Sequence, residues 1–323
     1  MNRNISQCID VNSKYCPCLL AETNQCIFCS HLKGEMTCNC NWAGVCILYE
    51  KHWQYKKIQQ QCEDSIKTRM EEEVTFTIKE QISENTYRME MQVSNEFAEP
   101  LMSIGSFVFI KRPNDPAFFY FPVNIMRAQD NTLEIVIEAI GPKSIRVFAD
   151  NNDKIVVRGP YWNGVLGQPW IDNLTYGKII LVAGGIGQAP AFPLAVNLMS
   201  NNNQVTAVLA PGKVGKIFIE EQLRELGVVV HIVPSLRKNG MPMLEELLHQ
   251  NPDLIVSAGP DSQHYGVIRT MQAAGVNIPM VATNNATMCC GEGICGSCLK
   301  KVQDNKEIKL CKQQTDFLKI VED

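Results

Sequence analysis

The chain has 323 residues, enough for two or three domains, and its hydrophobic content of 45% and charged content of 20% are those of a water-soluble globular protein. A net charge of −4, with lysines and arginines scattered along the chain, gives no basis for nucleic-acid binding. The first residues lack the apolar core of a secretory signal, and the longest apolar runs, such as residues 179–183, are too short to span a membrane. Fourteen cysteines in such a chain favour metal binding over disulfides, so we expect a cytoplasmic protein.

The first 65 residues form a cysteine-rich segment. Nine cysteines precede residue 63, none lies between residues 63 and 288, and five follow. A segment this short cannot bury enough apolar surface to fold alone, so we expect a metal to stabilise it. Thiolates suit zinc or iron–sulfur, and we favour a second cluster, [4Fe–4S], over structural zinc or loose thiols. The candidate ligands, of which the pattern does not single out four, are Cys16, Cys18, Cys26, Cys29, Cys38, Cys40 and Cys46.

Short strands follow the cysteine-rich segment. Alternating or β-rich patterns recur at residues 74–78, 87–93, 106–111, 118–125, 133–139 and 154–158. Strands at this density, with turn residues between them, predict an antiparallel β-barrel, which we place at residues 71–168.

From about residue 177, buried strands alternate with helical stretches. Continuous apolar runs predict strands at residues 178–183, 204–209, 228–233 and 254–258. Helical patterns end near residue 198 and cover residues 216–226 and 243–250. This alternation predicts a parallel, doubly wound α/β domain, which we place at residues 175–280.

Two glycine loops follow strands of this domain. The first loop contains Gly184, Gly185 and Gly187. Glycines let the backbone approach a pyrophosphate, and the helix N-terminus that follows offers N–H donors. Pro190 replaces the usual third glycine, and a strand-to-helix turn without a ligand is the alternative. A second loop, with Gly259 and Pro260, also follows a buried strand, so the two loops should converge on one crevice that binds a nicotinamide dinucleotide.

The last domain, at residues 281–323, carries a cysteine motif. Residues 290–298 read CGEGICGSC, and Cys311 follows at a distance. The spacing of Cys290, Cys295, Cys298 and Cys311 is that of a plant-type [2Fe–2S] site. The glycines permit the backbone angles that a loop around a cluster needs. Zinc prefers two short-spaced cysteine pairs, so we expect [2Fe–2S], with Cys289 as a spare thiol or an alternative ligand.

The order of these motifs resembles that of the electron-transfer subunit of type B dihydroorotate dehydrogenase. It is equally similar to the small subunits of sulfide dehydrogenase and of NAD-dependent ferredoxin–NADP oxidoreductase, all in the ferredoxin reductase superfamily. The resemblance covers roughly residues 70–323. It implies a flavin-binding barrel, a nicotinamide domain and a C-terminal [2Fe–2S] loop. It also implies a larger flavin or iron–sulfur oxidoreductase subunit as partner, with ferredoxin as a further candidate.

The resemblance further implies flavin-binding residues in the barrel. They are Pro122, Asn124, Gly141, Pro142, Lys143, Ser144 and Gly159. The family's Arg-Pro-x-Ser or Arg-Pro-x-Thr motif is replaced by FPVN at residues 121–124, and Phe121 cannot neutralise a flavin phosphate. Asn124 can still bond a ring nitrogen, and Lys143 with Ser144 could meet a pyrophosphate. We expect FAD, and the alternative is a barrel that has kept its shape and lost the cofactor.

Together these features predict an NAD(P)H-linked flavin and iron–sulfur oxidoreductase subunit. It would move electrons between NAD(P)H, FAD and [2Fe–2S], to or from the partner subunit. The alternative, favoured by Phe121, is a non-catalytic iron–sulfur assembly or docking subunit. No catalytic side chain is predicted, because the five histidines are dispersed. Lys213 and Lys216 could meet a 2′-phosphate, but they could equally be solvated, so neither NAD nor NADP is favoured.

Overall fold

The computed structural model describes residues 9–10, 69–149, 153–293, 295–303 and 306–322. The N-terminal candidate ligands lie outside the described residues, and the metal predicted for them stays a prediction. These are Cys16, Cys18, Cys26, Cys29, Cys38, Cys40 and Cys46.

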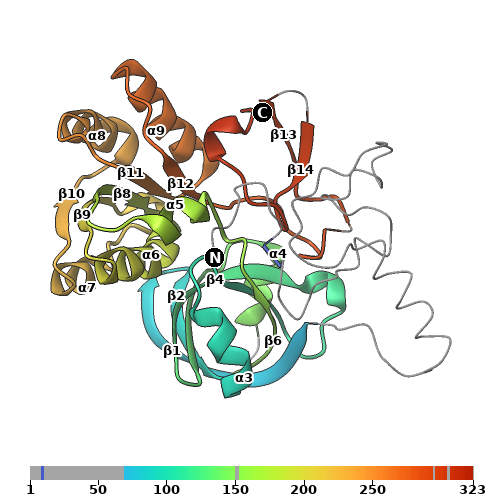
Figure 1. The fold of residues 1–323 in the computed structure, drawn as a ribbon. Helices are drawn as coiled ribbons and strands as arrows, with labels where there is room; N and C mark the ends of the chain where they lie inside the picture. The colour runs from blue at the N-terminus through green and yellow to red at the C-terminus, as the bar shows by residue number, and fades with distance from the viewer. Residues whose placement is uncertain (1–8, 11–68, 150–152, 294, 304–305, 323) are drawn as a thin grey trace, which may run out of the picture.

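Six strands of the described chain close into an antiparallel barrel, which confirms the predicted barrel (Figure 1). Around the barrel the strands follow the order β1-β2-β5-β4-β3-β6. Their bounds are β1 Met70–Ser83, β2 Thr86–Gln92, β3 Phe107–Lys111, β4 Phe121–Gln129, β5 Thr132–Glu138 and β6 Lys154–Tyr161. Alternate side chains fill the interior, as Met89 and Met91 do from β2, because successive strand residues point to opposite faces.

The strand predicted at residues 118–125 is wrong at its start. Residues Ala117–Phe119 form a 3₁₀ turn after Pro116, in which the Phe119 N–H donates to the Pro116 carbonyl at 2.9 Å. Strand β4 therefore begins only at Phe121, and it continues to Gln129 along β5. Two short helices lie in the barrel connections, α3 Asn95–Ala98 and α4 Pro142–Val147.

A second sheet has the order β10-β9-β8-β11-β12-β7 and is parallel except at β7, which runs antiparallel to β12. Its strands are β7 Val165–Leu166, β8 Lys178–Gly184, β9 Gln204–Ala210, β10 Val229–Ile232, β11 Leu254–Ala258 and β12 Met280–Thr283. The accompanying helices are α5 Gln168–Asn173, α6 Gln188–Ser200, α7 Glu220–Glu225, α8 Met241–Leu248 and α9 Asp261–Ala273. The predicted α/β domain is thus confirmed.

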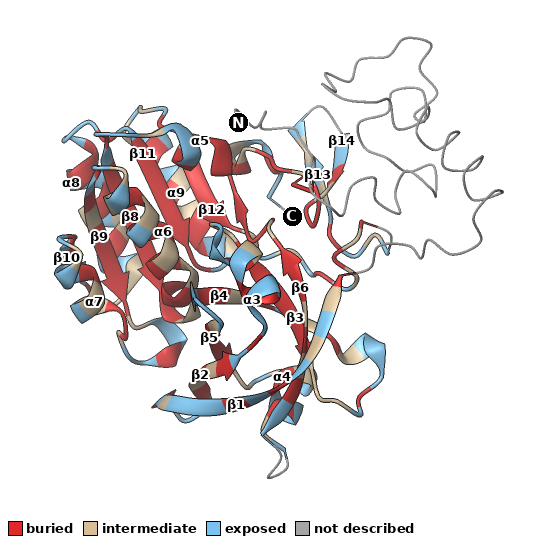
Figure 2. Cartoon of the chain, turned by 60° about the horizontal axis from the view of Figure 1, so that its bottom comes forward, coloured by how far each residue is buried: buried red, intermediate tan, exposed pale blue. Residues whose placement is uncertain are grey.

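Helices cover both faces of this sheet, which explains the continuous apolar run of its central strand (Figures 1 and 2). From β8, Leu181 packs in the core that contains α6 and α7. The next residue, Val182, packs in the core that contains α8 and α9. Both side chains are fully buried.

The helix predicted at residues 216–226 is too long, because α7 covers only Glu220–Glu225. The preceding residues Phe218 and Ile219 are buried, and the Phe218 N–H donates to the side chain of Gln188 at 3.0 Å instead of to a helical carbonyl. Helix α9 and strands β7 and β12 were not among the predicted elements.

The C-terminal segment adds a hairpin, β13 Leu299–Val302 and β14 Lys306–Lys309. Its residues Leu310 and Phe317 join the core beneath α8 and α9. Strand β7 lies within the stretch assigned to the barrel and β12 crosses residue 280, so the α/β sheet draws on both neighbouring stretches. The proposed domain limits stay predictions. Within the described ranges, no helix combines the length and apolarity needed to cross a bilayer.

Candidate functional site

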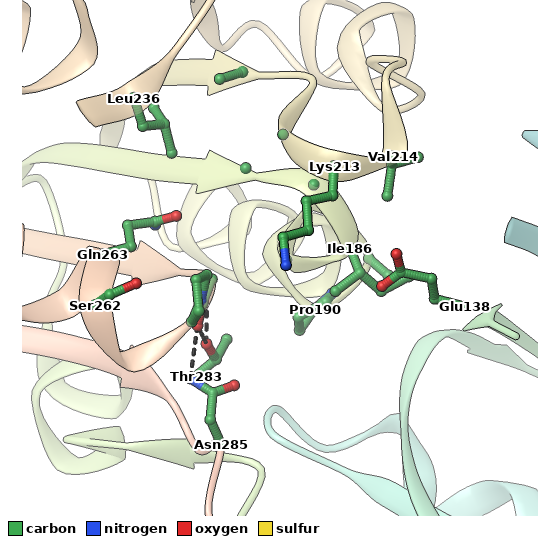
Figure 3. Close-up of a pocket in the computed structure, with 18 of the residues that line it drawn as sticks. Glu138, Ile186, Pro190, Lys213, Val214, Leu236, Ser262, Gln263, Thr283 and Asn285 are labelled. Carbon is green, nitrogen blue, oxygen red and sulfur yellow. Dashed lines mark hydrogen bonds between the residues drawn. The ribbon is translucent and has the colours of Figure 1, made fainter. Parts of the chain in front are cut away.

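A cleft of about 1230 Å³ lies between the barrel and the α/β sheet (Figure 3). Strands β4 and β5 form one wall, with residues such as Asn124 and Glu138. The other wall consists of the loops that follow β8, β9, β10, β11 and β12, all at the carboxyl ends of parallel strands. Ligands of open α/β sheets bind at this edge, so the cleft is the candidate site.

The two predicted glycine loops lie against each other at the cleft. A Cβ atom on Gly187 would lie 2.3 Å from the carbonyl oxygen of Ala258 and 2.8 Å from the Cα of Gly259. A third glycine loop joins them, since a Cβ on Gly212 would lie 2.7 Å from the amide nitrogen of Gly185. Gly185 and Gly212 both have a positive φ, of 57° and 55°. Only glycine permits these backbones to approach so closely.

The structure brings together most of the predicted cofactor-binding residues. Those that line the cleft are Pro122, Asn124, Ser144, Gly184, Gly185, Gly187, Gly259 and Pro260. The predicted residues that are not part of its lining are Gly141, Pro142, Lys143 and Gly159. The Nζ of Lys143 donates to the carbonyl of Tyr120 at 2.9 Å. A Cβ on Gly159 would meet Val108 at 3.2 Å, so this glycine serves packing inside the barrel.

The two lysines considered for a 2′-phosphate are separated. Lys213 projects into the cleft (Figure 3), whereas Lys216 pairs with Glu80 of β1 at 2.6 Å. Arg237 and Arg269 also line the cleft and were not predicted from the sequence. Arg237 could have been found as a cation that follows a predicted strand. Arg269 pairs with Glu322 at 3.0 Å, so Lys213 and Arg237 are the cations that favour an anionic ligand.

A buried hydrogen-bond network, also missed from the sequence, holds one glycine loop. The Oγ of Ser257 lies 2.8 Å from Nδ1 of His264, and Nε2 of His264 lies 3.1 Å from the carbonyl oxygen of Thr283. A neutral ring that carries its proton on Nε2 satisfies both contacts. Burial lowers the pKa of His264 to about 4, although Asp261 and the Thr283 carbonyl oppose this shift. The ring is therefore neutral near pH 7.

The network supports the loop rather than a nucleophile, because the Ser257 side chain is completely buried. Thr283 both accepts from the Gly259 N–H at 3.1 Å and donates to the Gly259 carbonyl at 3.0 Å (Figure 3). Asn285 donates to the same carbonyl at 2.6 Å. The second glycine loop is thus fixed by side chains from the end of β12.

The C-terminal cysteines form two interacting pairs. A hydrogen bond from Cys311 lowers the pKa of Cys298 to about 7, against the effect of burial. Burial raises the pKa of Cys295, but hydrogen bonds from Ser297 and Cys290 outweigh it and lower that pKa to about 6. Cys289 is exposed. The two pairs also interact with each other electrostatically. Among the described residues, no three of these side chains are arranged so that they could already hold a metal ion.

The loop that carries these cysteines depends on its glycines. Gly291, Gly293 and Gly296 have φ values of 71°, 74° and 76°. A Cβ on Gly291 would lie 2.7 Å from both Phe109 and Tyr161, so the loop packs directly on barrel aromatics. The N–H of Glu292 donates to the sulfur of Cys290 at 3.3 Å. Such N–H···S bonds are typical of loops that hold iron–sulfur clusters.

Comparison with known proteins shows which sequences are similar to this chain. No family model matches the sequence. Over 222 residues the chain is 28% identical to the dihydroorotate dehydrogenase B (NAD(+)) electron transfer subunit of Clostridium perfringens, covering 68% of this chain and 86% of that protein. It is 30% identical over 185 residues to the probable subunit of the same name from Methanopyrus kandleri, covering 55% of this chain and 67% of that protein. The chain belongs to the family of dihydroorotate dehydrogenase B electron-transfer subunits.

Solved structures show the fold of these subunits more widely. The structure of an NADH-dependent reduced ferredoxin–NADP oxidoreductase superposes with a TM-score of 0.60 at 18% identity, covering 80% of this chain and 91% of that one. A ferredoxin reductase of carbazole 1,9a-dioxygenase superposes with a TM-score of 0.51 at 15% identity, covering 66% and 69%. These likenesses show that the chain has the fold of ferredoxin reductases.

Proposed function

We propose that the chain is an electron-transfer subunit that moves electrons between NAD(P)H, FAD and a [2Fe–2S] cluster, to or from a larger oxidoreductase subunit. The observation that carries the proposal is the cleft, where barrel strand β4 faces the glycine loops of the α/β sheet. The substrate of the partner subunit is left open, as is ferredoxin as a second partner.

Within the α/β wall, backbone and side chains would share the binding of the dinucleotide. Gly184, Gly185 and Gly187 would let the pyrophosphate reach the turn that leads into α6, where the positive end of the helix dipole favours an anion. Lys213 and Arg237 would neutralise its phosphates from the neighbouring loops. Gly259 and Pro260, held by Thr283 and Asn285, would close the site opposite them.

Residues of the barrel wall would hold the flavin. Asn124, whose Oδ1 lies beside Gly164, would bond the ring, and Pro122 would shape the apolar surface next to it. Ser144 lines the cleft in the first turn of α4, where its hydroxyl accepts from the Gly141 N–H at 3.1 Å, so with Gly141, Pro142 and Lys143 it would support the flavin site through the start of this helix. When bound, a flavin supplies two-electron exchange with nicotinamide and one-electron exchange with iron–sulfur clusters.

The two cysteine pairs suit the two irons of a [2Fe–2S] cluster. We assign Cys290 with Cys295 to one iron and Cys298 with Cys311 to the other, because each pair already interacts within itself. The low pKa values of Cys295 and Cys298 favour the thiolates that such a cluster requires. Thiolate sites of this kind persist in a reducing cytoplasm, where we place the protein.

We retain a second metal centre in the N-terminal segment as a proposal. The support is its cysteine content, with [4Fe–4S] favoured over zinc.

The experiment is a visible spectrum of anaerobically purified protein, before and after addition of NADH or NADPH. We expect flavin and iron–sulfur absorption, both bleached by one of the nucleotides. Flavin absorption that neither nucleotide bleaches would contradict the nicotinamide site, and iron–sulfur absorption without flavin would favour the second candidate below.

That second candidate is a non-catalytic iron–sulfur docking subunit, and Phe121 favours it. Phe121 lines the cleft at the start of β4, where its ring offers no charge to a phosphate. Phe121→Arg should tighten FAD binding about tenfold if a flavin site remains, since one charge-assisted hydrogen bond is worth about 1.5–3 kcal/mol. Phe118→Arg, on an exposed side chain of the preceding turn, is the matched control. No FAD binding in either variant, by equilibrium titration, would support the docking subunit.

A further inference from the structure

Four charged side chains meet beside the C-terminal cysteine loop, and the proposed electron path does not use them. Asp10, Arg69, Glu292 and Lys312 form what we term the charge node. Arg69 contacts Asp10 at 2.6 Å and Glu292 at 3.0 Å. Lys312 contacts Glu292 at 2.8 Å and also pairs with Asp10. Within the described part of the chain the node thus consists of two cations and two carboxylates, whose charges sum to zero.

The node is buried, which makes it costly unless every charge is paired. Asp10 is 1% exposed and Lys312 is completely buried. Burial alone would raise the pKa of Asp10, but Lys312 and Arg69 lower it below its usual range. Each of the two carboxylates pairs with both cations. Apolar residues would often stabilise a fold as well as a buried ion pair, so stability alone does not account for the node.

Its position suggests another role. Glu292 lies inside the cysteine loop, two residues after Cys290, and Lys312 directly follows Cys311. The N–H of Glu292 donates to the sulfur of Cys290 at 3.3 Å, and Glu292 pairs with Lys312 at 2.8 Å. The node therefore includes a residue that bonds one predicted cluster ligand and a residue next in sequence to another.

Asp10 and Arg69 bring a more distant part of the chain to the same place. Asp10 precedes residues 11–68 and Arg69 follows them, and we call these two described positions the N-terminal flanks. Asp10 and Arg69 pair with each other in the node. The Ile9 N–H also donates to the Lys312 carbonyl at 2.8 Å. The Nη1 of Arg69 donates to the carbonyl of Pro160 at 2.8 Å, and its guanidinium lies 4.5 Å from the ring centre of Tyr161. The node therefore ties the N-terminal flanks, the barrel and the cysteine loop together.

We propose that the charge node positions the cysteine loop and sets the electrostatic field that its cluster experiences. The proposal rests on the proposed [2Fe–2S] site. Reduction adds one negative charge to a cluster, so nearby positive charge raises its reduction potential and nearby negative charge lowers it. Removal of a single charged member should therefore shift the potential in a direction set by the sign of the charge that is lost.

The test is a redox titration of full-length protein, followed by the electron paramagnetic resonance signal of the [2Fe–2S] cluster. Asp10→Asn should raise the potential, and Lys312→Met should lower it. The double variant Asp10→Asn/Lys312→Met restores a neutral node and should return the potential toward the wild-type value. If the node were purely structural, the two single variants would not shift the potential in opposite directions, and the double variant would not return it toward the wild-type value. Lys79→Met, which removes a cation from an exposed ion pair with Glu90, is the control and should shift nothing.

Failure of the proposal can be told from failure of the cluster assignment. Absence of iron and acid-labile sulfide in the wild-type protein would remove the [2Fe–2S] site itself. If both single variants bind the cluster but their reduction potentials shift in the same direction, or do not shift, the proposed role of the node is wrong. If a single variant loses its cluster, hydrogen exchange decides: faster exchange at residues 288–293 and 309–313 than in Lys79→Met supports positioning, and unchanged exchange refutes it.

Discussion

At the scale of single residues, adjacent cysteines differ sharply in surroundings. Cys290 is half-buried, accepts a hydrogen bond from the Glu292 N–H and interacts with Cys295, whereas Cys289 is exposed. Cys290→Ser should therefore abolish or shift the [2Fe–2S] electron paramagnetic resonance signal, because serine is a poorer ligand for iron. Cys289→Ser is the matched control and should leave the signal nearly intact. The reverse result would show that the ligand register is displaced by one residue.

The buried ring of His264 should make the stability of the protein depend on pH. An unfolded histidine has a pKa of about 6.5, whereas the buried ring of His264 has a pKa of about 4. Between these two pH values the unfolded chain is protonated at this residue and the folded chain is not. Its contribution to stability is complete above about pH 6.5 and is lost as the pH falls toward 4. Between about pH 7.5 and pH 5, His264→Gln should thus reduce the decline in the free energy of unfolding by roughly 2 kcal/mol.

Urea unfolding at the two pH values measures this difference. The lowered carboxyl pKa values of Asp10 and Glu292 add to the acid decline in both proteins, so they cancel in the comparison. His249→Gln, on an exposed histidine, should decline like the wild type. An unchanged decline in His264→Gln would mean that the ring is protonated in the folded protein.

At the scale of elements, the contact between the glycine loops decides nucleotide binding. Gly187→Ala would place a methyl group 2.3 Å from the Ala258 carbonyl oxygen, and backbone cannot yield as a flexible side chain does. The loops after β8 and β11 should move apart, and the affinity for NADH or NADPH should fall about tenfold or more, equivalent to about 1.4 kcal/mol. Fluorescence titration measures the dissociation constant.

Gly275→Ala provides the control for this variant. Gly275 has a φ of 67° and nothing within 4 Å of an added Cβ, so the substitution strains the backbone without a collision. It should lower stability by about 1–2 kcal/mol and leave nucleotide affinity unchanged. Wild-type affinity in Gly187→Ala would mean that the dinucleotide binds away from the two loops.

At the scale of the whole molecule, the N-terminal flanks and the C-terminal loop are one structural unit. A truncated protein that begins at Glu71 lacks Asp10 and Arg69, so the completely buried Lys312 loses its ion pair with Asp10. Loss of partners from a buried charge network costs about 3–5 kcal/mol. We expect the cysteine loop to lose order, seen as faster hydrogen exchange at residues 309–313, while the barrel strands keep their protection.

Elemental analysis of the same pair of proteins tests the N-terminal metal. The truncated protein can lose iron from the C-terminal [2Fe–2S] cluster, and the electron paramagnetic resonance signal of that cluster measures this loss. The full-length protein should contain more iron than the truncated one even after this loss is subtracted. Loss of zinc alone would make the segment a structural clip, and equal metal content would remove the proposed centre.

The class of fold and the order of the motifs follow from residue patterns alone. Strand alternation predicted the barrel, and continuous apolar runs such as residues 179–183 predicted strands buried on both faces, because each pattern follows from which faces are buried. The cleft residues Gly184, Gly187 and Gly259 were found because a backbone that must come close to another group requires glycine. The sequence was less accurate at boundaries, as at Phe121, where a local turn decides the start of the strand.

Only the tertiary structure decided which distant residues meet. Lys213 and Lys216 are near neighbours in sequence, yet one enters the cleft and the other pairs with Glu80 across to the barrel. Local pattern encodes periodicity, whereas an ion pair depends on where separate elements pack. The same holds for the charge node, since nothing in the sequence around Asp10 indicates Lys312. Lys312 lies near the opposite end of the chain and meets Asp10 because the fold brings the Ile9 N–H to the Lys312 carbonyl and Arg69 to both Asp10 and the barrel.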